Sequence, residues 1–306
     1  MTASRLAAAY VFDLAAGDPE WFPHPVRLFG RLTQLGERWA ARWASRPGRE
    51  LAAGSVVTGA VVGIAWLLGQ WRQPVWQILL AWTTLATRSL LDEAGAVIAA
   101  LDEGRLAEAR HLLARIVGRD TDSLDEAEIA RATIETLAES ACDGIVAPLF
   151  WLALGGVPSA MAYKAVNTLD SMIGHPDPPY RHFGRVAARL DDAANFIPSR
   201  LTAIGIAAAA GISGLDARRS LTIWQRDGYK HASPNAGQSE AAMAGALGVQ
   251  LGGTNLYDRR PHAAPLLYAG GRTPSAADAR AAAIIVATVS VIAFGVALLA
   301  LVRKGR

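Results

Sequence analysis

Two long runs without a charged residue constrain the fold of this 306-residue chain more than any other feature. The first run extends from Leu51 to Trp71 and the second from Ala281 to Val302. A helix of 21 residues, the length of the first run, is roughly 31 Å long, which matches the hydrocarbon core of a bilayer. Buried helices of soluble proteins are the alternative, but they rarely stay uncharged over such a length. Both runs therefore predict membrane-spanning helices.

Three further apolar stretches are harder to assign. Residues 74–91 are expected to return through the membrane as the second arm of a hairpin. Residues 145–166 are broken by Gly155-Gly156-Val157-Pro158, so they either cross the membrane or form a re-entrant pair of short helices. Residues 201–215 are marginal in length for a span. We therefore expect about four to five membrane helices.

Composition restricts the class of protein further. Apolar residues make up 52% of the chain and charged residues 19%, which excludes a disordered protein. The single cysteine, Cys142, excludes a disulfide-stapled secreted domain. The cations are scattered beside acids and form no basic run with interleaved aromatics, so we expect no nucleic-acid partner. Arg5 and Asp13 interrupt the apolar N-terminal stretch, which argues against a secretory signal peptide.

No internal repeat and no alternating strand pattern of useful length is present. The predicted fold class is therefore all-α, a polytopic integral membrane protein with a single membrane-embedded domain over residues 1–306. Polar groups concentrate in four loop regions with helical character, which are residues 13–50, 92–144, 167–200 and 216–280.

The positive charges favour a cytoplasmic side for two parts of the chain. The stretch 31–50 carries five arginines, and the tail carries Arg303, Lys304 and Arg306. With an odd number of spans between them these two stretches would lie on opposite sides of the membrane. The charge rule therefore does not settle the topology. We expect the motif-bearing loops to share the cytoplasmic side, with the break at 155–158 returning the chain to the side it left.

The first polar motif is Asp18-Pro19 followed by Pro23-His24-Pro25-Val26-Arg27. Prolines stiffen this loop, which presents Asp18, His24 and Arg27 together. One interpretation is a contact with an anion or a metal-bound phosphate. The alternative is a capped turn, because Asp-Pro is typical of a helix start.

The second motif lies in residues 119–143. Arg119 precedes a stripe of residues spaced four apart, Arg131, Glu135, Glu139 and Asp143, which share one helix face. Arg131 and Glu135 predict an ordinary salt bridge. Glu139 and Asp143 lie where the helix enters an apolar segment, and two such carboxylates suit Mg²⁺, a cation that prefers oxygen ligands. A solvated acidic face is the alternative.

The third motif places Lys164, Asn167 and Ser171 on one helix face, with Asp170 beside them. Lys164 ends an apolar run, so it could reach a phosphate as a point charge or extend to the membrane interface.

Two further motifs combine acids with amides. Asp191, Asp192 and Asn195 form an oxygen-rich group. A later group is listed here in chain order: Arg226, Asp227, His231, Ser233, Asn235 and Glu240. Ser233-Pro234-Asn235-Ala236-Gly237 reads as a turn into a helix, whose first backbone N–H groups could hold a phosphate. A loop followed by a packed helix is the alternative.

Together these motifs resemble the adenosylcobinamide-phosphate synthase family of cobalamin biosynthesis. The resemblance rests on the Asp18–Arg27 motif, Arg119-Asp120-Thr121, Asn167-Thr168-Leu169-Asp170-Ser171-Met172, Asp191-Asp192 and Ser233–Gly237, in this order. It implies a multi-pass enzyme of the cell (inner, cytoplasmic) membrane that joins adenosylcobyric acid to (R)-1-aminopropan-2-yl phosphate with ATP and Mg²⁺. Association with other membrane enzymes of late cobalamin assembly would fit this role.

Roles follow as hypotheses from residue type and this resemblance. The expected metal ligands are Glu139, Asp143, Asp170, Asp191 and Asp192. The expected catalytic residues are His24, His231, Lys164 and Asp227. The expected contacts to substrate and ATP phosphates are Asp18, Arg27, Arg119, Asn167, Ser171, Arg226, Ser233 and Asn235.

Two other functions remain open from sequence. An intramembrane prenyl or phosphoryl transferase would also use Asp and Asn motifs with Mg²⁺, although here the acidic motifs are dispersed. A transporter should show paired halves with matching helix breaks, whereas only the break at 155–158 is visible.

Overall fold

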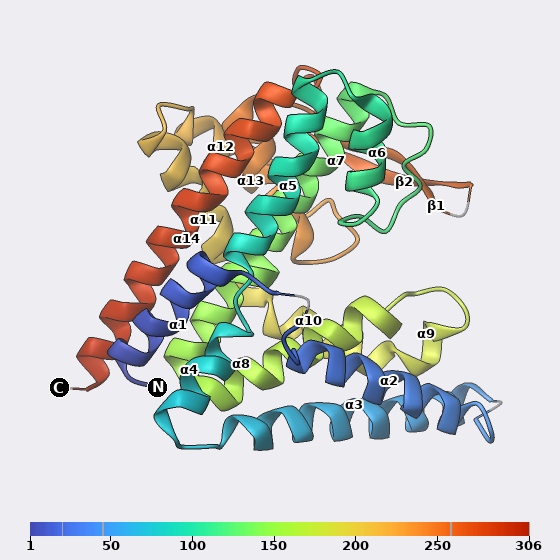
Figure 1. The fold of residues 1–306 in the computed structure, drawn as a ribbon. Coiled ribbons are helices and arrows are strands. Elements are labelled where there is room, and N and C mark those ends of the chain that lie inside the picture. The colour runs from blue at the N-terminus through green and yellow to red at the C-terminus, as the bar shows by residue number, and fades with distance from the viewer. Residues whose placement is uncertain (20, 45, 258, 306) are drawn as a thin grey trace. The chain divides into compact units, whose positions relative to one another are not determined.

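The computed structural model describes residues 1–306 except Glu20, Ser45, Asp258 and Arg306. Arg306, part of the basic tail considered above, therefore lies outside the described residues. The described chain is mostly helical and divides by its internal contacts into two compact units, each described by itself below. Figure 1 labels the helices and strands.

Unit 1 contains Met1–Ala86, Ala147–Asn195 and Phe294–Arg306. Its described helices are α1 (Ala3–Ala16), α2 (Pro25–Ala40), α3 (Pro47–Gly69), α4 (Pro74–Trp82), α8 (Ala147–Ile173), α9 (Tyr180–Phe183), α10 (Arg185–Ala194) and the last turns of α14 (Ala276–Lys304). Within this unit α3 packs on α2, α8 and α9, and α2 lies beside α3 (Figure 1).

Unit 2 contains Thr87–Val146 and Phe196–Ala293. Its described elements are α5 (Thr87–Asp102), α6 (Leu106–Leu113), α7 (Glu126–Ala141), the π-helical turn η1 (Cys142–Val146), α11 (Phe196–Ile212), α12 (Ala217–Asp227), α13 (Ala236–Leu247), β1 (Leu251–Tyr257), β2 (Arg260–Leu267) and the first part of α14. Helix α13 packs against α7, α11 and α12, and every residue from Gly237 to Leu247 is buried.

Three described helical stretches are long and apolar enough to cross a membrane. They are Pro47–Gly69, Glu126–Ile173 and Ala276–Lys304, and the bent pair α10–α11 adds a fourth if it forms one span. The uncharged run 281–302 falls within the third of these stretches, and all but the last two residues of the run 51–71 fall within the first, so both predicted spans are confirmed. The protein is thus an all-α polytopic membrane protein with three to four candidate spans, against the four to five expected.

The predicted crossing by residues 74–91 is wrong. Helix α4 is 9 residues long and ends at Trp82, and α5 begins at Thr87. The hydroxyls of Thr83 and Thr84 donate to the carbonyls of Leu80 and Ala81 at 2.9 and 2.7 Å. Such local hydrogen bonds compete with helix continuation, which the apolar character of the run does not reveal.

The predicted break in 145–166 is confirmed at one residue. Gly156, inside α8, has φ 72° and ψ −162°, a backbone conformation that is essentially confined to glycine. Residues 201–215 belong to α11, which qualifies as a candidate span only together with α10.

The strand hairpin was not predicted. β1 and β2 pair antiparallel with an irregular register between Leu251 and Gly253. Gly252 and Gly253 both have positive φ, and β2 contains two prolines, Pro261 and Pro265. Glycines and prolines conceal the alternation of apolar and polar residues by which a strand is usually recognised.

Because helices of unit 1 pack closely at Gly54, adding one methyl group there is expected to lower the stability of the protein. A Cβ at Gly54 of α3 would lie 1.8 Å from the carbonyl oxygen of Phe183, whereas a Cβ at Gly63 of the same helix meets nothing within 4 Å. We expect Gly54→Ala to destabilise the protein by about 1–3 kcal/mol through overpacking. Gly63→Ala should leave the midpoint of thermal unfolding in detergent unchanged or higher. Equal midpoints for the two variants would contradict this packing.

Candidate functional site

A buried carboxylate, Glu135, binds two arginines in unit 2. Arg131, one turn earlier on α7, contacts Glu135 at 3.1 Å, and Arg119 from the preceding loop contacts it at 2.5 Å. All three side chains are at most 11% exposed. The i,i+4 spacing explains the first contact, because residues four apart share a helix face. The second contact makes the pair a three-membered network.

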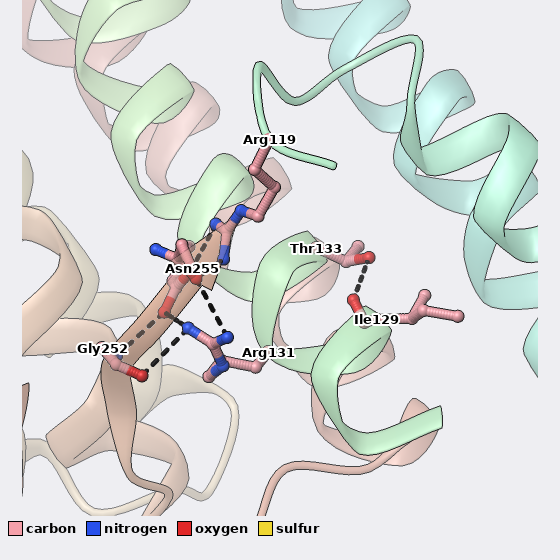
Figure 2. Close-up of polar contacts among 7 residues, drawn as sticks. Arg119, Ile129, Arg131, Thr133, Gly252 and Asn255 are labelled. Carbon is pink, nitrogen blue, oxygen red and sulfur yellow. Dashed lines mark hydrogen bonds and ion pairs between the residues drawn. The ribbon is translucent and has the colours of Figure 1, made fainter. Parts of the chain in front are cut away.

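The hairpin completes this network. Asn255 Oδ1 accepts hydrogen bonds from Arg119 at 2.6 Å and from Arg131 at 3.0 Å, and Arg131 also donates to the carbonyl of Gly252 at 2.9 Å (Figure 2). The backbone N–H of Gly252 donates to Glu135 at 2.8 Å. A Cβ on Gly252 would lie 2.0 Å from the carbonyl oxygen of Pro265, so only glycine fits here. The hairpin is thereby fixed to α7.

The placement of Arg119 bears on its predicted contact with a phosphate. Its guanidinium is committed to Glu135 and Asn255 among the described residues. Buried ion pairs are costly to break. Arg119 thus helps to hold the fold of unit 2, and its contact with substrate stays a prediction.

The loop before α13 is held together by its own polar groups. The N–H of Ser233 donates to His231 Nδ1 at 3.1 Å, and the N–H groups of Asn235 and Ala236 donate to Ser233 Oγ at 3.2 and 3.3 Å. Burial lowers the pKa of His231. The neutral ring then carries its proton on Nε2, because Nδ1 is the acceptor. Two of the N–H groups expected to bind phosphate are therefore already hydrogen-bonded.

Asp227 is the anchor of the neighbouring segment. Its carboxylate, fully buried, accepts hydrogen bonds from Arg226 at 2.8 Å and from the N–H of Tyr268 at 2.7 Å, and pairs with Lys230 at 2.7 Å. The Arg226 guanidinium, ahead of the other donors, holds the pKa of Asp227 far below its usual range. This geometry stabilises the loop, and a catalytic role for Asp227 or a substrate contact for Arg226 stays a prediction.

In unit 1 the first motif forms a helix cap. His24 is the N-cap of α2, where its Nδ1 accepts from the N–H of Val26 at 3.3 Å, and its Nε2 lies 3.3 Å from Asp18. Pro25 occupies the first helical position, where a missing N–H costs nothing. Arg27 is exposed on the first turn of α2. The capped-turn alternative placed the helix start at Asp18-Pro19, whereas the helix begins at Pro25 and His24 is its cap. A contact with phosphate stays a prediction.

The third and fourth motifs meet within unit 1, since α10 packs on α8. Asn195 donates to Asp191 at 3.0 Å and accepts from Tyr163 at 3.0 Å. Asn167 hydrogen-bonds to Asp191, and the Lys164 ammonium acts on the same carboxylate. This Lys–Asn–Asp group is a polar site between two helices.

Other members of these motifs have local partners. Asp192 pairs with Arg189 at 3.7 Å, and the Ser171 hydroxyl donates to the carbonyl of Asn167 at 2.9 Å. Asp170 lies close to Gly174, since a Cβ added at Gly174 would be 1.9 Å from Oδ1 of Asp170.

The five expected metal ligands are divided between the units. Glu139 and Asp143 belong to unit 2, whereas Asp170, Asp191 and Asp192 belong to unit 1. Across the described residues no group of three or more His, Cys, Asp or Glu side chains is arranged to hold a metal ion. The metal site stays a prediction.

Two residues of this network were not recognised from the sequence. Glu135 was expected to form an ordinary salt bridge, whereas it pairs with two buried arginines. Asn255 carried no signal, because it lies in a strand that the sequence pattern conceals.

Comparison with known proteins identifies the family. The family model described as "CobD/Cbib protein" matches residues 6–286. The chain belongs to the CobD/CbiB family. It is 47% identical over 268 residues to the cobalamin biosynthesis protein CobD of Geobacter metallireducens, with 85% of this chain and 84% of that protein covered.

A second relative is similar to the same extent. The chain is 48% identical over 273 residues to the cobalamin biosynthesis protein CbiB of Salmonella typhimurium, with 84% of each chain covered. No solved structure matches the chain. Membership in the CobD/CbiB family, with these relatives, supports a role in cobalamin biosynthesis.

The Glu135 network predicts a strong dependence of stability on one carboxylate. Glu135→Gln leaves two buried guanidiniums without their anion, which should cost this CobD/CbiB protein about 3–5 kcal/mol. The control is Glu93→Gln, which removes the more exposed pair with Arg115 and should cost about 1 kcal/mol or less. Thermal unfolding in detergent measures both. A Glu135 variant as stable as the control would show that the network does not hold unit 2 together.

The Asp227 anchor predicts a pH-dependent difference between wild type and Asp227→Asn. Because its pKa is depressed in the folded protein, Asp227 contributes stability that is complete above its unfolded value of about 3.9 and is lost as the pH falls through the folded value. The variant should therefore unfold at a lower temperature than wild type at pH 7, and the gap should narrow as the pH falls below about 4. A gap that is constant with pH would exclude the carboxylate charge as its cause.

Proposed function

We propose that this CobD/CbiB family member is a carbon–nitrogen ligase that joins adenosylcobyric acid to (R)-1-aminopropan-2-yl phosphate, giving adenosylcobinamide phosphate with consumption of ATP. The observation that carries the proposal is the family match over residues 6–286, which includes all five polar motifs. Location in the cytoplasmic membrane, with the reacting groups on the cytoplasmic side where ATP is found, belongs to the same proposal.

The chemistry explains why polar motifs are needed. A free carboxylate is a poor electrophile, so it first attacks the terminal phosphorus of ATP and ADP leaves. The amine then attacks the carbonyl carbon of the acyl phosphate, inorganic phosphate leaves and the nitrogen loses a proton. The protein must hold the two substrates in reactive geometry and stabilise the charge that develops on the phosphate and carbonyl oxygens.

The unit 1 polar site suits the phosphate part of this task. Lys164 supplies a point charge, and Asn167 and Asn195 orient the carboxylate of Asp191. In the neutral state His24 and His231 both use Nδ1 as an acceptor from backbone N–H, so each offers an N–H at Nε2. We infer that these histidines orient substrate or loop groups as donors.

Mg²⁺ is implied by the use of ATP. In proteins it is commonly held by one or two carboxylates together with substrate phosphates and water. The described residues contain no arrangement of three or more ligands for a metal ion, so Asp191 or Asp192 would hold an ion that arrives with ATP through one carboxylate each, with phosphate oxygens and water completing its ligands. When bound, the ion would neutralise the phosphate charge.

Activity of the purified protein tests the proposal. Detergent-solubilised wild type should form adenosylcobinamide phosphate, read by mass, from adenosylcobyric acid, aminopropanol phosphate and Mg·ATP, and none when ATP is omitted. The Asp191→Asn, Asp192→Asn double variant should lose activity, because amides keep the shape but lose the charge that holds a hard cation. Asp177→Asn in an exposed loop of the same unit is the control.

The outcomes are distinct. Absence of product from well-folded wild type would overturn the proposal. Near-normal activity of the double variant at limiting Mg²⁺ would leave the ligase assignment in place and move the metal to other carboxylates, with Glu139 and Asp143 next to be tested.

A further inference from the structure

Unit 1 contains a cavity where α1 begins and α14 ends. Its volume is about 670 Å³, and it is lined by the first residues of the chain, the break in α8 and the last turn of α14. Tyr10 of α1 and Phe294 of α14 stack with their ring centroids 4.2 Å apart, which holds the two helices side by side. The volume lies within the roughly 300–1,000 Å³ of sites for small ligands. None of the residues assigned to the proposed reaction lines this cavity.

The break in α8 brings backbone polar groups to the cavity. Gly155 and Gly156 line it, and Gly156 lies outside the helical conformation. Pro158 has no N–H, so it cannot donate to the carbonyl of Leu154 four residues earlier, as a helix would require. Irregular backbone near the hydrocarbon region is tolerated where it is buried in protein or lines a water-filled cavity. The break is therefore placed where a polar ligand can reach its backbone groups.

Lys304 gives the cavity a positive charge. Its side chain is part of the lining, and its Nζ donates to the carbonyl of Leu154 at 3.2 Å. An ammonium has three N–H donors, so this hydrogen bond leaves two for a ligand. Thr2 and Ser4 add hydroxyl groups to the lining, and none of the described residues that line the cavity is acidic. This combination of donors and charge favours an anion.

The position of the cavity favours a lipid headgroup as that anion. The uncharged run 281–302 of α14 is long enough to cross the hydrocarbon core, so Lys304, two residues after it, lies at the level of the headgroups. Val302, which lines the cavity, and Leu154 beside it are 41% and 56% exposed. Acyl chains cover such side chains in a bilayer. Basic pockets between membrane helices are typical binding sites for anionic headgroups.

We propose that this cavity binds the phosphate of an anionic phospholipid, with Lys304 as the cation and the acyl chains against Leu154 and Val302. A soluble phosphate would meet the same ammonium and backbone groups, but it would leave the two apolar side chains uncovered. The inference rests on the membrane character of the protein and is independent of the proposed ligase activity.

The test compares two lipids with identical acyl chains on the full-length protein in a non-ionic detergent. Phosphatidylglycerol is anionic, and phosphatidylcholine has the same phosphate but no net charge. Native mass spectrometry counts the bound lipids during a titration. Wild type should bind one phosphatidylglycerol at least about fivefold more tightly than phosphatidylcholine, as expected for one basic side chain at the headgroup level.

Two neighbouring cations provide a matched pair of variants. Lys304→Gln removes the charge that lines the cavity and should bring the ratio of the two affinities to about one. Arg303→Gln removes the same charge from a residue that does not line the cavity, so the ratio should stay near the wild-type value. Both side chains are exposed, so neither substitution should prevent folding, which thermal unfolding checks.

A third ligand separates the two sources of phosphate. Glycerol phosphate carries no acyl chains and should not bind at concentrations at which phosphatidylglycerol saturates the cavity. If it binds as tightly and displaces the lipid, the cavity takes a soluble phosphate and the inference is wrong.

The remaining outcomes also decide. Equal affinity of wild type for the two lipids overturns the inference without any variant. An undiminished preference for phosphatidylglycerol in Lys304→Gln overturns it as well. Equal loss of the preference in Lys304→Gln and Arg303→Gln would assign the effect to the total charge of the tail, and the cavity would then have no part in it.

Discussion

The salt bridge of Glu135 with Arg119 and Arg131 is the interaction on which the polar half of unit 2 depends. It joins the loop before α7, the helix itself and, through Asn255 and Gly252, the β-hairpin. Apart from Leu251, Gly252 and Leu267 the residues of β1 and β2 are exposed or half-buried, so these polar contacts contribute to fixing the hairpin. A buried ion pair contributes little net stability compared with apolar packing. Breaking it leaves an uncompensated buried charge, so the Glu135 network favours one arrangement of these segments over others.

The same network limits what its own arginines can bind. Their guanidinium donors face Glu135, Asn255 and a backbone carbonyl, so these donors are already engaged within unit 2. The polar site of unit 1 is built differently, since Lys164 and two asparagines act on the carboxylate of Asp191. Unit 2 thus uses its cations in a salt-bridge network, whereas unit 1 combines a cation with amide groups around a carboxylate.

Sequence predicted those features that depend on local composition. The spans within Pro47–Gly69 and Ala276–Lys304 followed from the absence of charge, and the α7 stripe followed from four-residue spacing. The stretch 74–91 could not be judged in this way, because hydrogen bonds of Thr83 and Thr84 end the helix without changing its apolar character. The partner of Arg119 was equally invisible, since Asn255 lies 136 residues away in a strand rich in glycine.

Sequence motifs also fail to show whether a polar group has spare hydrogen-bonding capacity. His24 and His231 each use Nδ1 to accept a backbone N–H, and Asp227 is surrounded by an arginine, a lysine and a backbone N–H. In the described structure these atoms anchor loops, and the catalytic role of the three residues stays a prediction. Because a ligand can bind only to groups that retain free donors or acceptors, such capacity is a better guide to a binding group than its presence in a motif.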